Sequence, residues 1–103
     1  MIDLIKQKRT ELEQLCARYQ VRRLALFGSA AGDDFDMLRS DLDFAVEFVP
    51  LSPSEHSKSY FGLMQALEDL FLRSVDLVEY GPIRNPYFRR ALEESQVMLY
   101  EAA

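Results

Sequence analysis

The sequence predicts a two-layer α/β domain in which a small mixed sheet is packed with helices. Short apolar runs alternate along the chain with longer segments whose apolar residues recur at helical spacing. Helix-start signals and chain breaks separate these two kinds of segment. The chain has 103 residues, 49% of them hydrophobic and 28% charged. This size and composition indicate one domain, residues 1–103, with a single core.

The N-terminal half opens with an amphipathic helix from Ile2 to about Tyr19, whose apolar residues face away from a polar side of Lys, Glu and Gln. Two strands are expected next, from Arg22 to Phe27 and from Leu42 to Val49, because both runs are apolar enough to lie within a sheet. A polar loop from Ala31 to Ser40 connects them.

The C-terminal half begins with a capping box at Ser52-Pro53-Ser54-Glu55, which predicts a helix to about Leu72. Val75 to Glu79 follows as a short strand pattern. After two proline-containing breaks, Tyr87 to about Ser95 predicts a short helix and Val97 to Tyr100 a last strand.

Two aspartates, Asp41 and Asp43, are spaced two apart at the start of the second strand pattern. The two-residue period of a strand directs both carboxylates to one face of the sheet, where they repel each other. Mg²⁺ held by carboxylates and nucleotide phosphates relieves such repulsion. The alternative is a solvated strand edge.

Two further features fit the same chemistry. Gly28-Ser29 ends the first strand as a strand-to-helix turn would, and offers N–H groups and a hydroxyl to a phosphate, although Ser29 also suits a helix N-cap. Asp76 lies between apolar neighbours in a later strand, although aspartate is also a turn residue. Three carboxylates on adjacent strands can bind two metal ions for an in-line displacement at phosphorus.

These motifs resemble the nucleotidyltransferase superfamily with the DNA polymerase β type fold, whose signature is Gly-Ser, a loop, Asp-x-Asp and a later Asp. More narrowly, the chain resembles the minimal nucleotidyltransferases that act as antitoxins beside HEPN-domain ribonuclease toxins. Segments outside the signature also carry this resemblance: Tyr60-Phe61-Gly62-Leu63, Val75-Asp76-Leu77-Val78, and Asn85-Pro86-Tyr87-Phe88-Arg89-Arg90 through Glu93-Glu94-Ser95.

The resemblance implies transfer of AMP from ATP to a tyrosine of the cognate HEPN toxin. Asp41, Asp43 and Asp76 are then the metal ligands for two Mg²⁺ ions, with Asp76 also the general base, and Gly28, Ser29 and Arg39 are the nucleotide-binding residues. Two alternatives stay open: a non-catalytic nucleotide-binding antitoxin that neutralises the toxin by covering it, and an adenylyltransferase for a small molecule.

The composition of the chain indicates which kinds of partner it binds. The formal net charge of −5 argues against direct binding of nucleic acid, which depends largely on Lys and Arg. The clusters of basic residues in the chain suit either of two roles: a solvated surface, or a surface that contacts triphosphate or an acidic partner. Cys16 is the single cysteine, so a reducing cytosol is compatible, and the chain has no apolar run of 18 residues and no leader pattern. We therefore expect a cytoplasmic protein that does not bind membranes.

The loop after Gly28-Ser29 departs from the family pattern in two places. Eleven residues, Ala30 to Ser40, lie between Ser29 and Asp41, where the family commonly has ten. Ala31 lies just before Gly32, at a position where relatives often carry a basic residue. A lost charge-assisted phosphate contact costs about 1.5–3 kcal/mol. We therefore expect Ala31→Arg to tighten ATP binding roughly tenfold or more, as measured by titration calorimetry. An unchanged dissociation constant would show that Arg39 or another residue already fills the role.

Overall fold

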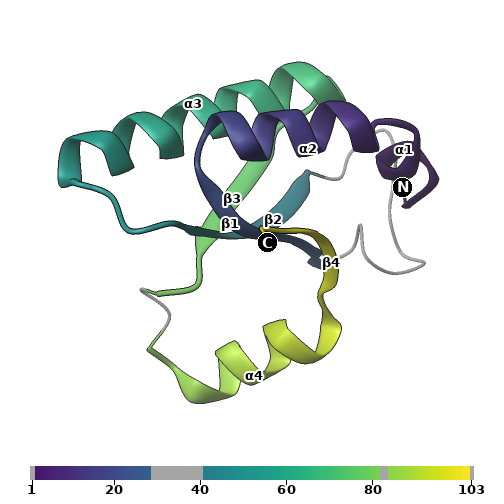
Figure 1. Ribbon diagram of the computed structural model, residues 1–103. Helices are drawn as coiled ribbons and strands as arrows, with labels where there is room; N and C mark the ends of the chain where they lie inside the picture. The colour runs from purple at the N-terminus through teal and green to yellow at the C-terminus, as the bar shows by residue number, and fades with distance from the viewer. Residues whose placement is uncertain (1, 29–40, 82–83, 103) are drawn as a thin grey trace.

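The structure, a computed structural model, describes residues 2–28, 41–81 and 84–102. Four strands form one mixed sheet in the order β3-β2-β1-β4, in which β3 runs parallel to β2 and the other neighbours are antiparallel. This arrangement confirms the predicted α/β fold with a small mixed sheet (Figure 1). In chain order the elements are α1 (Ile2–Gln7), α2 (Arg9–Arg18), β1 (Val21–Phe27), β2 (Leu42–Phe48), α3 (Pro53–Phe71), β3 (Val75–Glu79), α4 (Pro86–Ser95) and β4 (Val97–Glu101).

The N-terminal helix is the one element that differs from its prediction by more than its ends. It is broken at Lys8, whose backbone has φ −99° and ψ 14°. The Lys8 N–H still donates to the carbonyls of Leu4 and Ile5, each at 3.1 Å, and its own carbonyl accepts from Leu12. Because hydrogen bonding continues across the break, the apolar spacing also continues, and neither glycine nor proline marks the kink.

One face of the sheet forms the main core with α2 and α3, which lie together above the sheet in Figure 1. Alternate strand residues point to this side, as the two-residue period requires. The helix α3 starts as the sequence predicted, since the Ser52 hydroxyl accepts the N–H of Glu55 at 3.2 Å. Fully buried side chains of this core include Leu12, Cys16, Leu24, Leu26, Leu42, Phe44, Val46, Leu63 and Leu67.

The opposite face of the sheet is covered by α4, which lies below the sheet in Figure 1. Here a small cluster forms between Ala45, Tyr80 and Leu92, with Phe27 packed against it. The starts of β2 and β3 lie outside this cluster, and Asp41 and Asp76 are exposed there. One face of the sheet thus makes the core, and the other leaves its acidic end accessible.

Candidate functional site

The parallel pairing of β3 with β2 places Asp43 directly opposite Asp76. Both side chains point to the α4 side of the sheet, because their neighbours Leu42, Phe44 and Leu77 are buried in the main core on the other side. Asp43 is half-buried and Asp76 is exposed. Asp41 precedes Asp43 by two residues and is also exposed, so the three acids predicted from the sequence lie at one end of one sheet face.

The electrostatics of these acids is unfavourable without a cation. Burial raises the pKa of Asp43 above its ordinary value, and the hydrogen bond with Asp76 and the negative charges of Asp76 and Asp41 raise it further. Asp43 and Asp76 therefore form a close pair of carboxylates that a positive ion between them would stabilise. A pair of this kind is typical of a metal-binding or acid–base site.

Asp41 acts on this pair through its charge. In residues 2–28, 41–81 and 84–102, no three His, Cys, Asp or Glu side chains converge tightly enough to hold a metal ion by themselves. Mg²⁺ is usually bound by one or two carboxylates together with phosphates and water, so the Asp43–Asp76 pair has the right donors for a nucleotide-bound ion.

Gly28 lies against the carboxylate of Asp43. Its backbone has φ +72°, and a Cβ atom at this position would lie 2.5 Å from Asp43 Oδ2. Only glycine suits both this conformation and this contact. The end of β1 therefore approaches the acid pair with bare backbone. Ser29 and Arg39, also predicted to bind nucleotide, lie outside the described residues.

Two side chains of α3 hold β3 on either side of Asp76. The Tyr60 hydroxyl donates to the Leu77 carbonyl at 2.6 Å, and the Val75 N–H donates to Glu68 Oε2 at 3.1 Å. Because β3 is an edge strand, these bonds satisfy backbone groups that no further strand pairs. The sequence patterns gave no signal for the contact of Tyr60 with β3.

The comparison with known families shows which of them the chain belongs to. A family model described as "Nucleotidyltransferase domain" matches residues 8–99 of the chain. The matched region contains Gly28, Asp41, Asp43 and Asp76. The chain therefore belongs to the nucleotidyltransferase domain family and is an enzyme of that class.

Individual proteins show which kinds of nucleotidyltransferase the chain is similar to. The chain is 34% identical over 95 residues to "Putative protein adenylyltransferase MJ0128" of Methanocaldococcus jannaschii, covering 92% of this chain and 90% of the relative. A solved "putative minimal nucleotidyltransferase" is 28% identical, with a TM-score of 0.73 and 92% of each chain covered. A chain in the complex of tri-AMPylated Shewanella oneidensis HEPN toxin with MNT antitoxin shares the fold, with a TM-score of 0.63, 18% identity, and 94% of this chain and 72% of that chain covered.

In the part of the chain that the structure describes, no helix is both long enough and apolar enough to cross a membrane. The expected cytoplasmic location stays a prediction.

Replacing Asp43 with Asn removes the carboxylate whose pKa is raised. A raised pKa means that the folded state binds the proton more tightly than the unfolded chain, so ionisation of Asp43 disfavours folding once the pH exceeds the ordinary aspartate value of 3.8. We expect Asp43→Asn to raise the melting temperature of the metal-free protein at pH 7, and the gain to shrink as the pH falls toward 3.8.

Thermal unfolding in EDTA at pH 7 and pH 4.5 checks this prediction. The matched control is Asp69→Asn, because Asp69 is an exposed acid on α3 whose side chain accepts from Gln65, as an asparagine oxygen also can. A melting temperature that falls at pH 7 for Asp43→Asn would contradict the repulsion inferred for the acid pair.

Proposed function

We propose that this nucleotidyltransferase transfers AMP from ATP to a tyrosine hydroxyl of a HEPN-domain ribonuclease toxin, and thereby acts as its antitoxin. The observation that carries the proposal is the register that sets Asp43 beside Asp76 on an open sheet face. The relative named as a protein adenylyltransferase, and the shared fold with a chain from the complex that contains an AMPylated HEPN toxin, support this choice of reaction and partner.

Mg²⁺ is the cofactor that this site fits. Asp43 and Asp76 supply paired carboxylate oxygens, Asp41 adds negative charge from the same end of the sheet face, and Gly28 leaves room beside Asp43. Two Mg²⁺ ions, when bound, neutralise the triphosphate and lower the pKa of the acceptor hydroxyl. In this proposal Asp41 and Asp43 would hold the ion on the triphosphate and, together with Asp76, the second ion, with phosphate oxygens and water completing the ligands of each.

Asp76 is the residue we assign as general base. It is exposed on the edge strand, where an acceptor can reach it, and the hydrogen bonds from α3 to β3 fix its position. Asp76 takes the proton of the tyrosine hydroxyl while the tyrosine oxygen forms a bond to the α-phosphorus of ATP. The bond from that phosphorus to the bridging oxygen breaks, and pyrophosphate leaves.

The remaining residues of the proposed site hold the nucleotide. The backbone at Gly28 and the hydroxyl of Ser29 bind the terminal phosphates, and Arg39 adds a positive charge to the phosphate contacts. In this proposal the HEPN protein supplies the acceptor hydroxyl. We place this reaction in the cytoplasm, where both ATP and Mg²⁺ are available.

Incubation of the chain with the cognate HEPN protein, ATP and Mg²⁺ tests the proposal. Intact-mass measurement should show additions of roughly 329 Da per AMP on the HEPN protein. The chain alone should show little activity, because no hydroxyl is then held in line with the α-phosphate. Asp76→Asn should abolish the addition while the two proteins still associate, and the surface control Asp69→Asn should keep full activity.

One result would replace this proposal with a non-catalytic antitoxin. In that case the HEPN protein is inhibited but keeps its unmodified mass, and Asp76→Asn protects cells as well as the wild type does. Transfer of AMP to small hydroxyl compounds, with none to the HEPN protein, would instead indicate a small-molecule adenylyltransferase.

A further inference from the structure

The helix α4 is held to the domain by little burial. Leu92 is its one buried residue, whereas Tyr87 is 83% exposed and Phe88 47% exposed. Asn85 caps the helix, since its Oδ1 accepts the N–H groups of Tyr87 at 2.9 Å and Phe88 at 3.2 Å. A helix of ten residues is marginal in water by itself. The Asn85 cap therefore holds the two large aromatic rings of Tyr87 and Phe88 at the start of α4, although these rings contribute little to the core.

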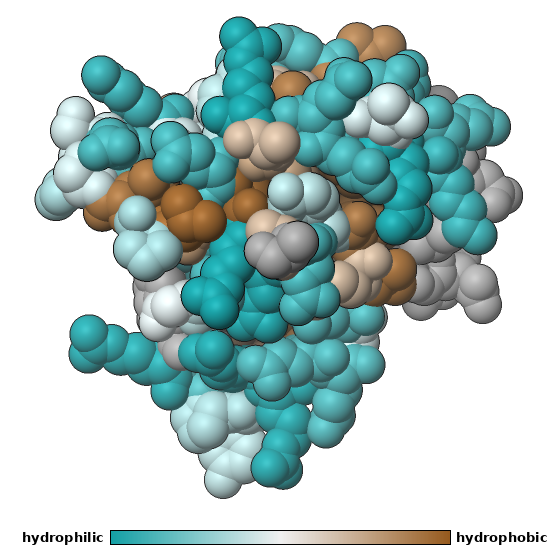
Figure 2. Space-filling view, viewed as in Figure 1, coloured by the Kyte–Doolittle hydropathy of each residue, from teal (hydrophilic) through white to brown (hydrophobic). Residues whose placement is uncertain are grey.

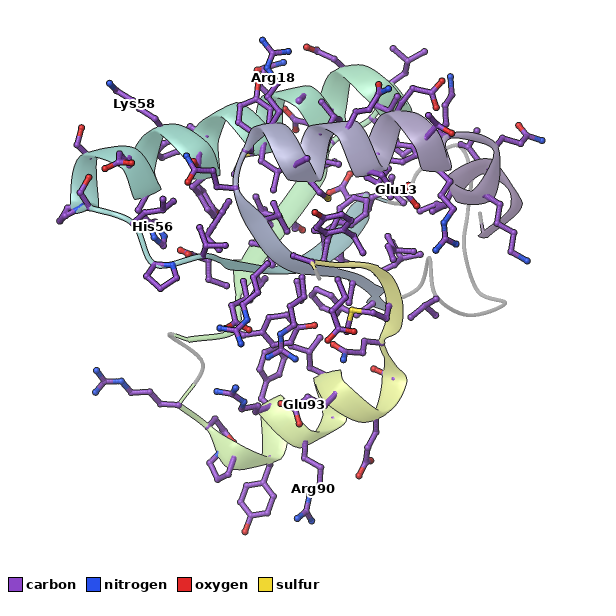
Figure 3. All side chains as sticks on the ribbon, viewed as in Figure 1. Glu13, Arg18, His56, Lys58, Arg90 and Glu93 are labelled. Carbon is purple, nitrogen blue, oxygen red and sulfur yellow. The ribbon has the colours of Figure 1, made fainter. Side chains whose placement is uncertain are left out.

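The charge around these rings is opposite to that of the whole chain. Residues 81–92 contain three arginines and no acid, although the net charge of the chain is −5. Arg89 is engaged with Glu93 at 3.1 Å and with the Tyr80 carbonyl at 3.3 Å. Within the described part of the chain, Arg84 and Arg90 form no ion pair, and Figure 3 shows Arg90 pointing away from the sheet.

The charges at the ends of α4 do not complement its helix dipole. A helix is stabilised by acids in its first turn and by bases in its last turn, and α4 has neither. Its arginines lie toward the start, and Glu93 and Glu94 lie toward the end. Figure 2 shows hydrophilic and intermediate residues over this end of the molecule, at the bottom of the view. The exposed basic and aromatic groups are therefore available for a partner.

The position of α4 sets what such a partner reaches. The helix packs on the same sheet face as the acids, with Leu92 against Ala45 and Tyr80. Tyr80 follows Asp76 by four residues, about 13 Å along an extended strand. A protein bound to α4 thus lies on the sheet face that carries the acid pair.

We propose that Arg84, Tyr87, Phe88 and Arg90, which we name the α4 face, bind an acidic surface of the protein that supplies the acceptor hydroxyl. This inference rests on the proposed function. Tyrosine, phenylalanine and arginine are enriched at protein interfaces, and two guanidinium groups that pair with no acid among the described residues complement carboxylates. Nucleic acid is disfavoured as the occupant, because two arginines neutralise few phosphates and the acids on the same sheet face repel a polyanion.

The experiment compares two double charge reversals that change the net charge equally. Arg84→Glu/Arg90→Glu alters the α4 face, and Arg18→Glu/Lys58→Glu alters exposed positions on α2 and α3, which cover the other side of the sheet. We expect the first to weaken binding of the cognate HEPN protein at least tenfold in calorimetry, and the second to change it less than twofold. Tyr87→Ser should also weaken binding, and circular dichroism confirms that each variant folds.

The outcomes separate this inference from the proposed function. If the α4 variants lose binding but the wild-type complex transfers no AMP, the α4 face is supported as the binding surface and the proposed function is overturned. If both α4 variants bind the HEPN protein and transfer AMP as well as the wild type does, the α4 face is not the binding surface, and the proposed function is kept. Tight binding of a 20-nucleotide single-stranded RNA that the α4 reversal abolishes, with HEPN binding unchanged, overturns the surface in favour of nucleic acid. Failure of the wild type to bind the HEPN protein overturns both.

Discussion

The pairing of β3 with β2 is the constraint on which the rest of this domain depends. Its register places Leu42 and Phe44 beside Val75 and Leu77 in the core, and the same register sets Asp43 opposite Asp76 on the other face. A shift of one residue would move Asp76 toward the core and break both arrangements together. Stability and the acid pair are therefore fixed by the same backbone hydrogen bonds, and Tyr60 and Glu68 secure them from α3.

The two faces of the sheet have different roles. The face under α2 and α3 buries large apolar side chains and supplies most of the hydrophobic stabilisation. The face under α4 buries only a small cluster around Tyr80 and carries the acids. Burial and like charge raise the pKa of Asp43, so the acid pair is retained at some cost to stability. Such a cost is typical of functional sites, where a ligand supplies the missing compensation.

Local patterns predicted most of the fold. The Ser52 capping box marked the start of α3, and Val75–Glu79 was predicted with its observed ends, because both signals lie within a few residues of sequence. The break at Lys8 left no such signal. Strand periodicity placed Asp41 and Asp43 on one face, but the pairing of Asp43 with Asp76 and the contact of Tyr60 with Leu77 depend on residues distant in sequence. The roles of Ser29 and Arg39 remain sequence-based predictions.

The central claim is that the acidic end of this sheet face binds a metal–nucleotide complex. Titration calorimetry of Mg²⁺-ATP into the chain and into its Asp41→Asn/Asp43→Asn variant tests this claim most directly. The double substitution removes two negative charges from the site, so affinity should fall by orders of magnitude while the fold is kept. Equal affinity of Mg²⁺-ATP for the wild type and the variant would contradict the account.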